Sequence, residues 1–196
     1  MDRLWNEIAS DSKEYSDFLD AFLPHLSNYI EELGIKEVTY FHTSDEPSEE
    51  HIDGYKNASG LLRKHLKGYK FMDAVSHFEF SNLMDIPVVG IQSMQEFIDK
   101  GASHAWIYTC CCPPNIFPNR FIAMPSGRNR ILPTMMYKYN IPGYLHWGFN
   151  FYNSQLSKKH INPYAVTDSE YAFPSGDPFS VYPYEDGATH SIRSRV

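Results

Sequence analysis

Short apolar runs alternate with amphipathic stretches along most of the chain, and this alternation constrains the fold more than any other feature. Five runs rich in β-branched and aromatic residues predict strands, at 37–42, 69–75, 86–91, 105–110 and 143–150. Helical periodicity of apolar residues, or residues typical of helix starts and ends, predicts helices at 15–33, 49–66, 94–100 and 133–139. Strands separated by helices pair in parallel, because a parallel crossover needs a long connection. The expected fold class is therefore α/β.

Two architectures fit this order of elements, a doubly wound sheet and a (β/α)8 barrel, because they differ in strand count and closure rather than in local pattern. No glycine-rich phosphate loop follows a predicted strand, which disfavours a nucleotide site. Both architectures place their chemistry at the carboxyl ends of the strands. The residues to inspect are those just past Phe41, Val75, Ile91, Tyr108 and Trp147. In the helix at 133–139, Pro133 is expected in the first turn, where its missing N–H costs nothing.

Charge and hydropathy exclude several kinds of partner. Lys and Arg number 17 against 24 Asp and Glu, a net charge of −7, which disfavours nucleic acid and anionic membranes. No stretch approaches the roughly 18 apolar residues of a membrane span, and the first residues lack a signal-peptide pattern. We expect a soluble segment whose localisation stays unknown.

The three cysteines are consecutive, Cys110, Cys111 and Cys112. Neighbours on a strand point to opposite faces, so these residues cannot build a disulfide framework and are expected to be free thiols. Zinc sites need ligand pairs at a characteristic spacing, and neither the cysteines nor the scattered histidines show one. We expect no metal and no cofactor.

Asp45 and Glu46 form a pair of carboxylates at the end of the first predicted strand. Such a pair suits glycoside hydrolysis, in which one group protonates the leaving oxygen and another manages the developing positive charge. Alternatively, Ser44 or Asp45 caps the next helix, with Pro47 in its first turn.

Adjacent side chains on extended backbone diverge, so the pair fits poorly as a nucleophile and acid facing each other at about 5 Å. A substrate-assisted scheme fits better. In it Glu46 donates the proton, the 2-acetamido oxygen of the substrate attacks the anomeric carbon, and Asp45 orients that amide.

Four motifs in order carry a resemblance to a known family. They are Phe41-His42-Thr43-Ser44-Asp45-Glu46-Pro47, Trp106-Ile107-Tyr108-Thr109-Cys110-Cys111, Gly143-Tyr144-Leu145-His146-Trp147-Gly148, and Gly176-Asp177 through Tyr182-Pro183 to Ser191-Ile192-Arg193. On these motifs the chain resembles the catalytic domain of glycoside hydrolase family 123, the former domain of unknown function 4091.

The resemblance implies a (β/α)8 TIM-type barrel that removes β-linked N-acetylgalactosamine, or a related N-acetylhexosamine, from a glycan or glycoside by retaining, substrate-assisted hydrolysis. It makes Glu46 the general acid/base and Asp45 the residue that polarises the acetamide. It also places that pair after the fourth strand. We therefore expect an incomplete barrel of strands four to eight over 1–160, an irregular C-terminal extension over 161–196 that packs on it, and self-association through the missing half.

Four further residues are candidate sugar contacts. Trp147 is expected to form a hydrophobic floor and Tyr108 to hydrogen-bond the acetamide or a hydroxyl, while packing in the core explains these two equally well. His42 is expected to contact the substrate or, alternatively, to satisfy a hydrogen bond inside the barrel, and Asn150 is a similar but weaker case. Two other functions stay open. One is a catalytically silent carbohydrate-binding or structural barrel fragment, and the other is a thiol-dependent hydrolase that uses the cysteines.

Overall fold

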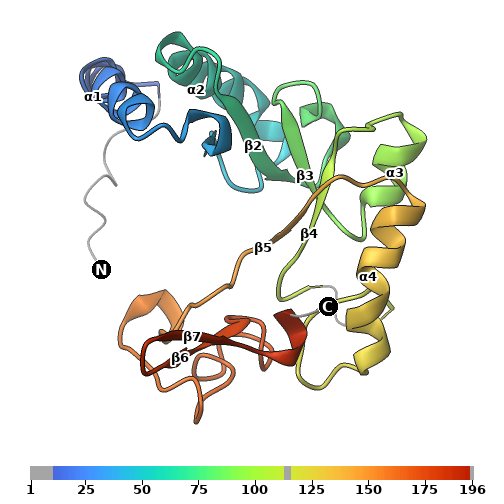
Figure 1. The fold of residues 1–196 in the computed structure, drawn as a ribbon. Coiled ribbons are helices and arrows are strands. Elements are labelled where there is room, and N and C mark those ends of the chain that lie inside the picture. Colours follow the sequence, from blue (N-terminus) through green and yellow to red (C-terminus); the bar gives the residue numbers. More distant parts are fainter. Residues whose placement is uncertain (1–10, 113–115, 195–196) are drawn as a thin grey trace. The chain divides into compact units, whose positions relative to one another are not determined.

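The computed structural model describes residues 11–112 and 116–194 (Figure 1). The first residues, where the sequence shows no signal-peptide pattern, lie outside the described part. The chain divides into two compact units, Met1–Val88 and Val89–Val196. Their boundary falls within strand β3 (Ile86–Gly90). The expected boundary near residue 160 stays a prediction.

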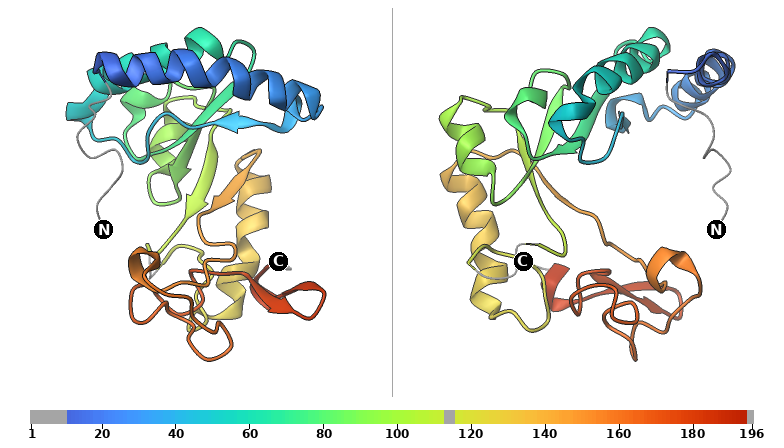
Figure 2. Two further views of the ribbon diagram at one scale, coloured as in Figure 1. Left: turned by 90° about the vertical axis from the view of Figure 1, so that its left-hand side faces the viewer. Right: turned by 180° about the vertical axis from the view of Figure 1, so that it is seen from behind.

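The described residues of the first unit, from 11 on, form two long helices, two strands and three short 3-10 helices. In chain order they are α1 (Lys13–Glu32), η1 (Lys36–Val38), β1 (Tyr40–Phe41), η2 (Glu49–His51), α2 (Ile52–His65), β2 (Lys70–Val75) and η3 (Phe78–Phe80). Helices α1 and α2 pack side by side, as the views of Figure 2 show.

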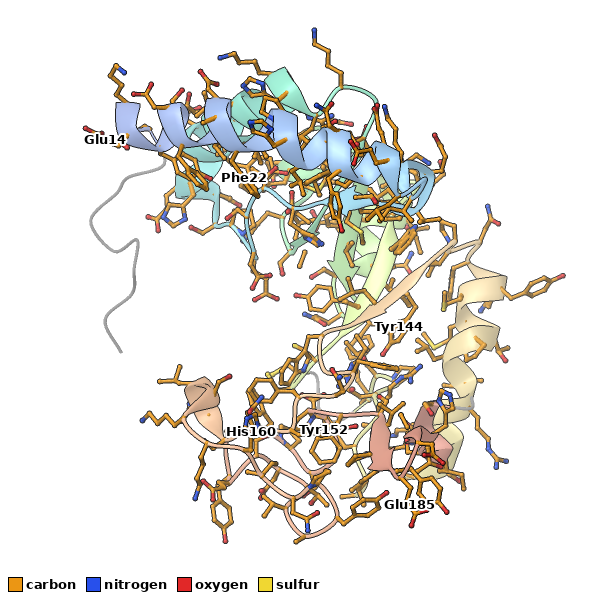
Figure 3. The ribbon with its side chains drawn as sticks, turned by 60° about the vertical axis from the view of Figure 1, so that its left-hand side comes forward. Glu14, Phe22, Tyr144, Tyr152, His160 and Glu185 are labelled. Carbon is orange, nitrogen blue, oxygen red and sulfur yellow. The ribbon has the colours of Figure 1, made fainter. Side chains whose placement is uncertain are left out.

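The second unit combines further β and α elements with a largely irregular C-terminal part. In chain order they are α3 (Met94–Asp99), β4 (Trp106–Thr109), α4 (Ser126–Lys138), β5 (Tyr144–His146), η4 (Gln155–Ser157), β6 (Val181–Tyr184), β7 (Gly187–His190) and η5 (Ile192–Ser194). Strands β6 and β7 form an antiparallel hairpin, and Figure 3 labels Glu185 in its turn.

Hydrogen-bonded neighbours in the five-stranded sheet follow the order β1-β2-β3-β4-β5, which is also their order in the chain. The pairs β1 with β2 and β4 with β5 are parallel. Barrels wind in one direction in this way, whereas doubly wound sheets reverse their strand order at a switch point. The α/β class is confirmed, and the strand order is compatible with part of a TIM-type barrel.

Helix α1 shows how the sequence sets local structure. Ser12 caps it by accepting a hydrogen bond from the backbone N–H of Tyr15 at 3.2 Å, and Gly34 follows its end with φ of +66°. The buried stripe of α1 packs on α2 and β2. The buried members of this cluster are Leu19, Leu23, Ile30, Leu66, Tyr69 and Phe71.

Some expected boundaries were wrong. The strand at 37–42 contracts to β1, because η1 occupies its first half. Helix α4 begins at Ser126, so Pro133 lies in its interior and not in its first turn. Pro133 has no N–H to donate to the carbonyl four residues earlier, so one helical hydrogen bond is missing. The helix nevertheless continues through this turn, where the neighbouring Leu132 is buried. In the tail, the hairpin β6–β7 was not predicted.

Among the helices of the described residues, none combines the length and apolarity needed to cross a bilayer.

Replacing Leu23 by Ala is expected to lower the free energy of unfolding by about 2–5 kcal/mol, because it opens a cavity in this cluster. Leu23 is 4% exposed, whereas Leu33, at the end of the same helix, is 52% exposed. Leu33→Ala is the matched control and should change stability by only about 0.5 kcal/mol. Urea denaturation measures both, and equal losses would contradict the assigned core.

Candidate active site

The loop that follows β1 is held by one buried carboxylate. Asp73, in β2, is fully buried, and its Oδ1 accepts hydrogen bonds from the backbone N–H groups of Thr43 at 2.7 Å and Ser44 at 3.2 Å. Its Oδ2 accepts a bond from the hydroxyl of Tyr55, on α2, at 2.5 Å. Both oxygens of a costly buried charge are thus satisfied. Asp73 therefore ties this loop to β2 and α2.

Tyr55 stays protonated in this arrangement. Its side chain is buried, and burial, followed by the bond to the Asp73 carboxylate, raises its pKa well above the ordinary value of 10.0. The phenol therefore remains a hydrogen-bond donor to Asp73 at any physiological pH.

His42 directly follows β1 and lies at the edge of the same cluster. Its Nδ1 is 3.6 Å from Asp73 Oδ1, while 57% of its side chain is exposed. Its pKa is raised from 6.5, first by hydrogen bonding to Asp73, against the opposing effect of partial burial, with a smaller contribution from the charge of Asp45. His42 is thus a cation-forming group beside the predicted acid pair.

Asp45 and Glu46 are both exposed and lie in this loop. The N–H of Glu46 donates to the carbonyl of Ala74 at 3.1 Å, and its φ of +43° is uncommon for a non-glycine residue. Such backbone strain is often found at functional sites. Both residues border a hollow of about 450 Å³. Its lining also includes Tyr15, Thr43, Ser44, Pro47, His51, Gly54, Tyr55 and Ala58.

The pair does not cap the next helix. The residue at the N-cap of η2 is Ser48, so the proposed capping by Ser44 or Asp45, with Pro47 in the first turn, is wrong. The loop after β1 extends past Pro47, and η2 begins only beyond it. Asp45 and Glu46 consequently precede η2 and lie at the hollow.

Trp147 follows β5 in the second unit and is 36% exposed. Its ring centroid lies 4.6 Å from that of Phe173 and 5.5 Å from that of Phe151. Its indole N–H donates to Asp177 Oδ2 at 2.9 Å. The indole is therefore partly exposed, supported by two aromatic rings and fixed at its polar edge.

Tyr108 and Asn150 occupy different environments in the same unit. Tyr108 lies in β4 and is only 7% exposed, while Asn150 is exposed and forms an isolated antiparallel bridge with Phe179. Further along, Tyr152 donates its hydroxyl proton to the carbonyl of Val181 at 2.9 Å, and Figure 3 labels it among the loops beyond β5. The sugar contacts of Tyr108 and Asn150 stay predictions.

The predicted residues therefore form two groups, each within one unit. His42, Asp45 and Glu46 come together on the loop after β1, and Tyr108, Trp147 and Asn150 belong to the second unit.

Within the described ranges, one group of side chains has the composition of a metal site. Ligand atoms of Glu49, His77 and Glu79 lie within 4.8 Å of one another, and His77 Nδ1 is 3.1 Å from Glu49 Oε1. These side chains are exposed or half-buried, and exposed acidic groups commonly lie together in this way without a metal ion.

None of the three cysteines forms a disulfide in the described residues, as expected. Desolvation, together with the neighbouring thiols, raises the pKa of Cys111 to about 12. This thiol therefore remains protonated at neutral pH.

Two buried acids escaped the sequence interpretation. Asp73 interrupts the apolar strand run Phe71-Met72-Asp73-Ala74-Val75, and a charge inside such a run is the signal that could have revealed it. Asp177 belongs to a recognised motif, but nothing in its sequence context indicates its bond to Trp147.

Comparisons with known proteins agree with the motifs. The sequence profile described as the glycoside hydrolase 123 catalytic domain matches residues 2–196. No curated protein matches the chain. Among solved structures, the fold is similar to that of a family 123 glycoside hydrolase from Clostridium perfringens, studied for glycolipid glycan hydrolysis, with a TM-score of 0.70 and 18% identity. The match covers 94% of this chain and 33% of that one, so the chain spans about a third of its length.

Together, the fold and the sequence profile place the chain in the class of glycoside hydrolase catalytic domains. Within that class, the chain belongs to glycoside hydrolase family 123. The resemblance inferred from the four motifs is confirmed.

The raised pKa of His42 predicts a pH-dependent contribution to stability. A histidine whose folded pKa lies above 6.5 stabilises the fold fully below pH 6.5, and this contribution is lost as the pH rises through the raised value. The difference in unfolding free energy between the wild type and His42→Gln should therefore shrink with rising pH. Urea denaturation across a pH series measures it, with exposed His25→Gln as the matched control. A difference that is constant with pH would contradict the pairing with Asp73.

Gly148, which follows Trp147, allows two segments to approach closely. A Cβ on Gly148 would lie 2.6 Å from the carbonyl oxygens of Asp177 and Pro178. Gly148→Ala should therefore destabilise the protein by about 1–3 kcal/mol, because backbone must move to accept it. Gly127→Ala, in α4, meets no atom within 4 Å and is the control, expected to be neutral or stabilising. Thermal unfolding compares them, and an unchanged melting temperature for Gly148→Ala would refute this close approach.

Proposed function

We propose that the protein hydrolyses β-linked N-acetylhexosaminides, with N-acetylgalactosaminides preferred, by a retaining, substrate-assisted mechanism. The observation that carries the proposal is the adjacent pair Asp45 and Glu46, exposed at a hollow of about 450 Å³ after a strand of a family 123 catalytic domain. A hollow of this size suits a small ligand such as a monosaccharide.

Glu46 is the general acid of the first step. It donates its proton to the glycosidic oxygen as the bond from that oxygen to the anomeric carbon breaks. The acetamide oxygen of the same sugar forms a bond to the anomeric carbon from the opposite face. Asp45 accepts a hydrogen bond from the acetamide N–H, which orients the amide and stabilises the positive charge of the cyclic oxazolinium intermediate.

Glu46 then acts as the base of the second step. It takes a proton from a water molecule, whose oxygen attacks the anomeric carbon as the ring of the intermediate opens. Two displacements at the same carbon restore the β configuration, and the acetamide is regenerated. The step needs no metal-bound water and no second enzyme carboxylate as nucleophile.

Adjacency of the acids supports substrate assistance over a double displacement at an enzyme carboxylate. The latter needs carboxyl groups about 5 Å apart on opposite sides of the sugar. Asp45 and Glu46 come from one short loop held by Asp73, so both approach the substrate from the same segment. An acid and an amide-orienting group can be neighbours, because they act on adjacent parts of one sugar.

Trp147 is the aromatic candidate for sugar binding in this proposal. Its partly exposed indole, backed by Phe173 and Phe151, suits stacking on the apolar face of a pyranose ring. His42, Tyr108 and Asn150 are the polar candidates for hydroxyl and acetamide contacts. The similar hydrolase from Clostridium perfringens was studied for the hydrolysis of glycolipid glycans, and this supports a glycan as the substrate class.

The raised pKa of Cys111 argues against this residue as the nucleophile of a thiol-dependent hydrolase. A nucleophilic cysteine needs a lowered pKa so that the thiolate is populated. Cys111 shows the opposite shift, to about 12.

Glu46→Gln is expected to lower kcat on 4-nitrophenyl N-acetyl-β-galactosaminide by about 10²–10⁴-fold, because general acid catalysis is lost. Asp45→Asn should lower it by about 10²–10³-fold through loss of charge stabilisation. The variants are assayed in the natural full-length protein, with nearby exposed Glu50→Gln as the matched control. A thiazoline mimic of the oxazolinium should inhibit competitively.

The alternative functions give different results in the same assays. An equally active Glu46→Gln protein would refute the assignment of the acid, and no inhibition by the thiazoline would argue against substrate assistance. Sugar binding by calorimetry without hydrolysis would instead select the silent carbohydrate-binding module. Inactivation by iodoacetamide without an effect at Glu46 would select a thiol-dependent enzyme.

A further inference from the structure

The turn Cys110-Cys111-Cys112 directly follows β4 and has no role in the proposed hydrolysis. Cys111 and Cys112 are exposed, and Cys110 is half-buried. Cysteine is among the most buried residue types in proteins, so adjacent thiols at the surface are unusual. Packing in a core therefore does not explain this group of side chains.

The backbone of the turn is held by one buried side chain. Asn119, which is 1% exposed, donates from Nδ2 to the carbonyl oxygen of Cys110 at 2.8 Å and to that of Cys112 at 3.3 Å. The backbone N–H of Cys110 also donates to the carbonyl of Cys112 at 3.3 Å. Both ends of the turn are thus fixed, and the side chains start from defined positions before any ligand binds.

The turn brings two sulfur atoms together. Side chains of neighbours on a strand diverge, but residues 110–112 lie beyond the end of β4. Cys111 Sγ is 3.9 Å from Cys110 Sγ. Metal–thiolate bonds are about 2.3 Å long, so one ion can join two sulfur atoms that are up to about 4.6 Å apart. Cys110 and Cys111 are therefore already at the spacing of two ligands of one metal ion.

The electrostatic environment of Cys111 favours a bound cation. Desolvation is the main cause that raises the pKa of Cys111 to about 12, and the neighbouring Cys110 and Cys112 raise it further. The neighbours act in this direction because two negative sulfur atoms side by side repel each other. A thiophilic cation between the sulfur atoms removes that repulsion, and it releases the thiol protons to solvent as it binds.

The number of ligands selects the kind of ion. Among the described residues, no third side chain of a metal-binding type lies within 4.8 Å of both sulfur atoms. Thiolates select Cu(I), zinc and iron–sulfur clusters, but structural zinc and iron–sulfur clusters need four protein ligands. A pair of thiolates therefore suits Cu(I).

We propose that Cys110 and Cys111 form a binding site for a single Cu(I) ion, which their two thiolates hold. Each thiol loses its proton and no electron is transferred, so the copper keeps its oxidation state. The expectation of no metal came from the ligand spacing of zinc sites, which two adjacent thiolates do not require. The site lies within the second unit and is independent of the proposed hydrolysis.

The test titrates Cu(I), supplied without oxygen as its acetonitrile complex, into the natural full-length protein against the coloured competitor bicinchoninate. The wild type should bind one equivalent more than the variant that carries both Cys110→Ser and Cys111→Ser. Either single change should weaken the site by about 10²–10⁴-fold, because the second thiolate no longer acts intramolecularly. Cys112→Ser is the matched control, since it removes an adjacent exposed thiol that is not a ligand, and should leave the affinity unchanged.

Asn119→Ala tests whether the turn prearranges the two ligands. It keeps all three thiols and should weaken Cu(I) binding by about 10–100-fold, as removal of a supporting hydrogen bond does at other metal sites. The X-ray absorption spectrum of the bound copper should show two sulfur ligands in the wild type. Circular dichroism checks that each variant is folded, and the exposed Cys111→Ser decides the outcome if Asn119→Ala is not.

Three results would overturn the proposal. Equal numbers of Cu(I) ions in the wild type and the double variant would show that no ion binds at this turn. Equal losses of affinity in the three single variants would show adventitious binding to thiols and not a site built from Cys110 and Cys111. Zinc binding as tight as Cu(I) binding would contradict a site with only two ligands.

Discussion

The buried Asp73 carboxylate is the interaction on which the candidate acid site in the first unit depends. It accepts two backbone N–H bonds from the loop after β1 and a third bond from the Tyr55 hydroxyl, so one side chain joins β1, β2 and α2. Its burial makes these bonds strong, because no water competes for them. The exposed Asp45 and Glu46 therefore lie on a loop whose start is determined by the core.

The second unit also contains a buried carboxylate that is hydrogen-bonded to a residue nearer the surface. Asp177 is buried and bonded to partly exposed Trp147, much as Asp73 is buried beneath the exposed acids. In both places an internal carboxylate accepts hydrogen bonds from a loop or side chain nearer the surface. Buried charges contribute little to stability on balance, but they restrict a structure to one arrangement of donors. In a hydrolase domain, that restriction suits the precise placement that chemistry on a sugar requires.

The candidate acids follow a strand of a sheet whose neighbouring strands are sequential in the chain. In parallel α/β folds the loops after the strands are the usual place for functional residues. The loop after β1 adds a left-handed backbone at Glu46 and the bond from Glu46 N–H to β2. A pair of adjacent acids is then compatible with a mechanism in which the substrate provides its own nucleophile.

Local patterns in the sequence determined the class of elements and their order. The stripe of α1, the apolar strands and the Asp45-Glu46 motif are all visible without coordinates, because periodicity and residue type report local burial. Helix α4 was misjudged because Pro133 resembles a start signal, whereas packing of its neighbour Leu132 decides the outcome. The hairpin escaped notice although its Glu185-Asp186-Gly187 turn is a recognisable signal.

Tertiary structure alone decided the partners of the buried acids. Asp73 meets residues about 30 positions away, and Asp177 meets Trp147 from 30 positions away, and no local pattern encodes such pairings. The capping alternative for Asp45 was likewise settled by where the helix begins, after Ser48. Sequence thus determined which groups are available for chemistry, and folding determined which of them are held, since long-range contacts depend on the packing of the whole unit.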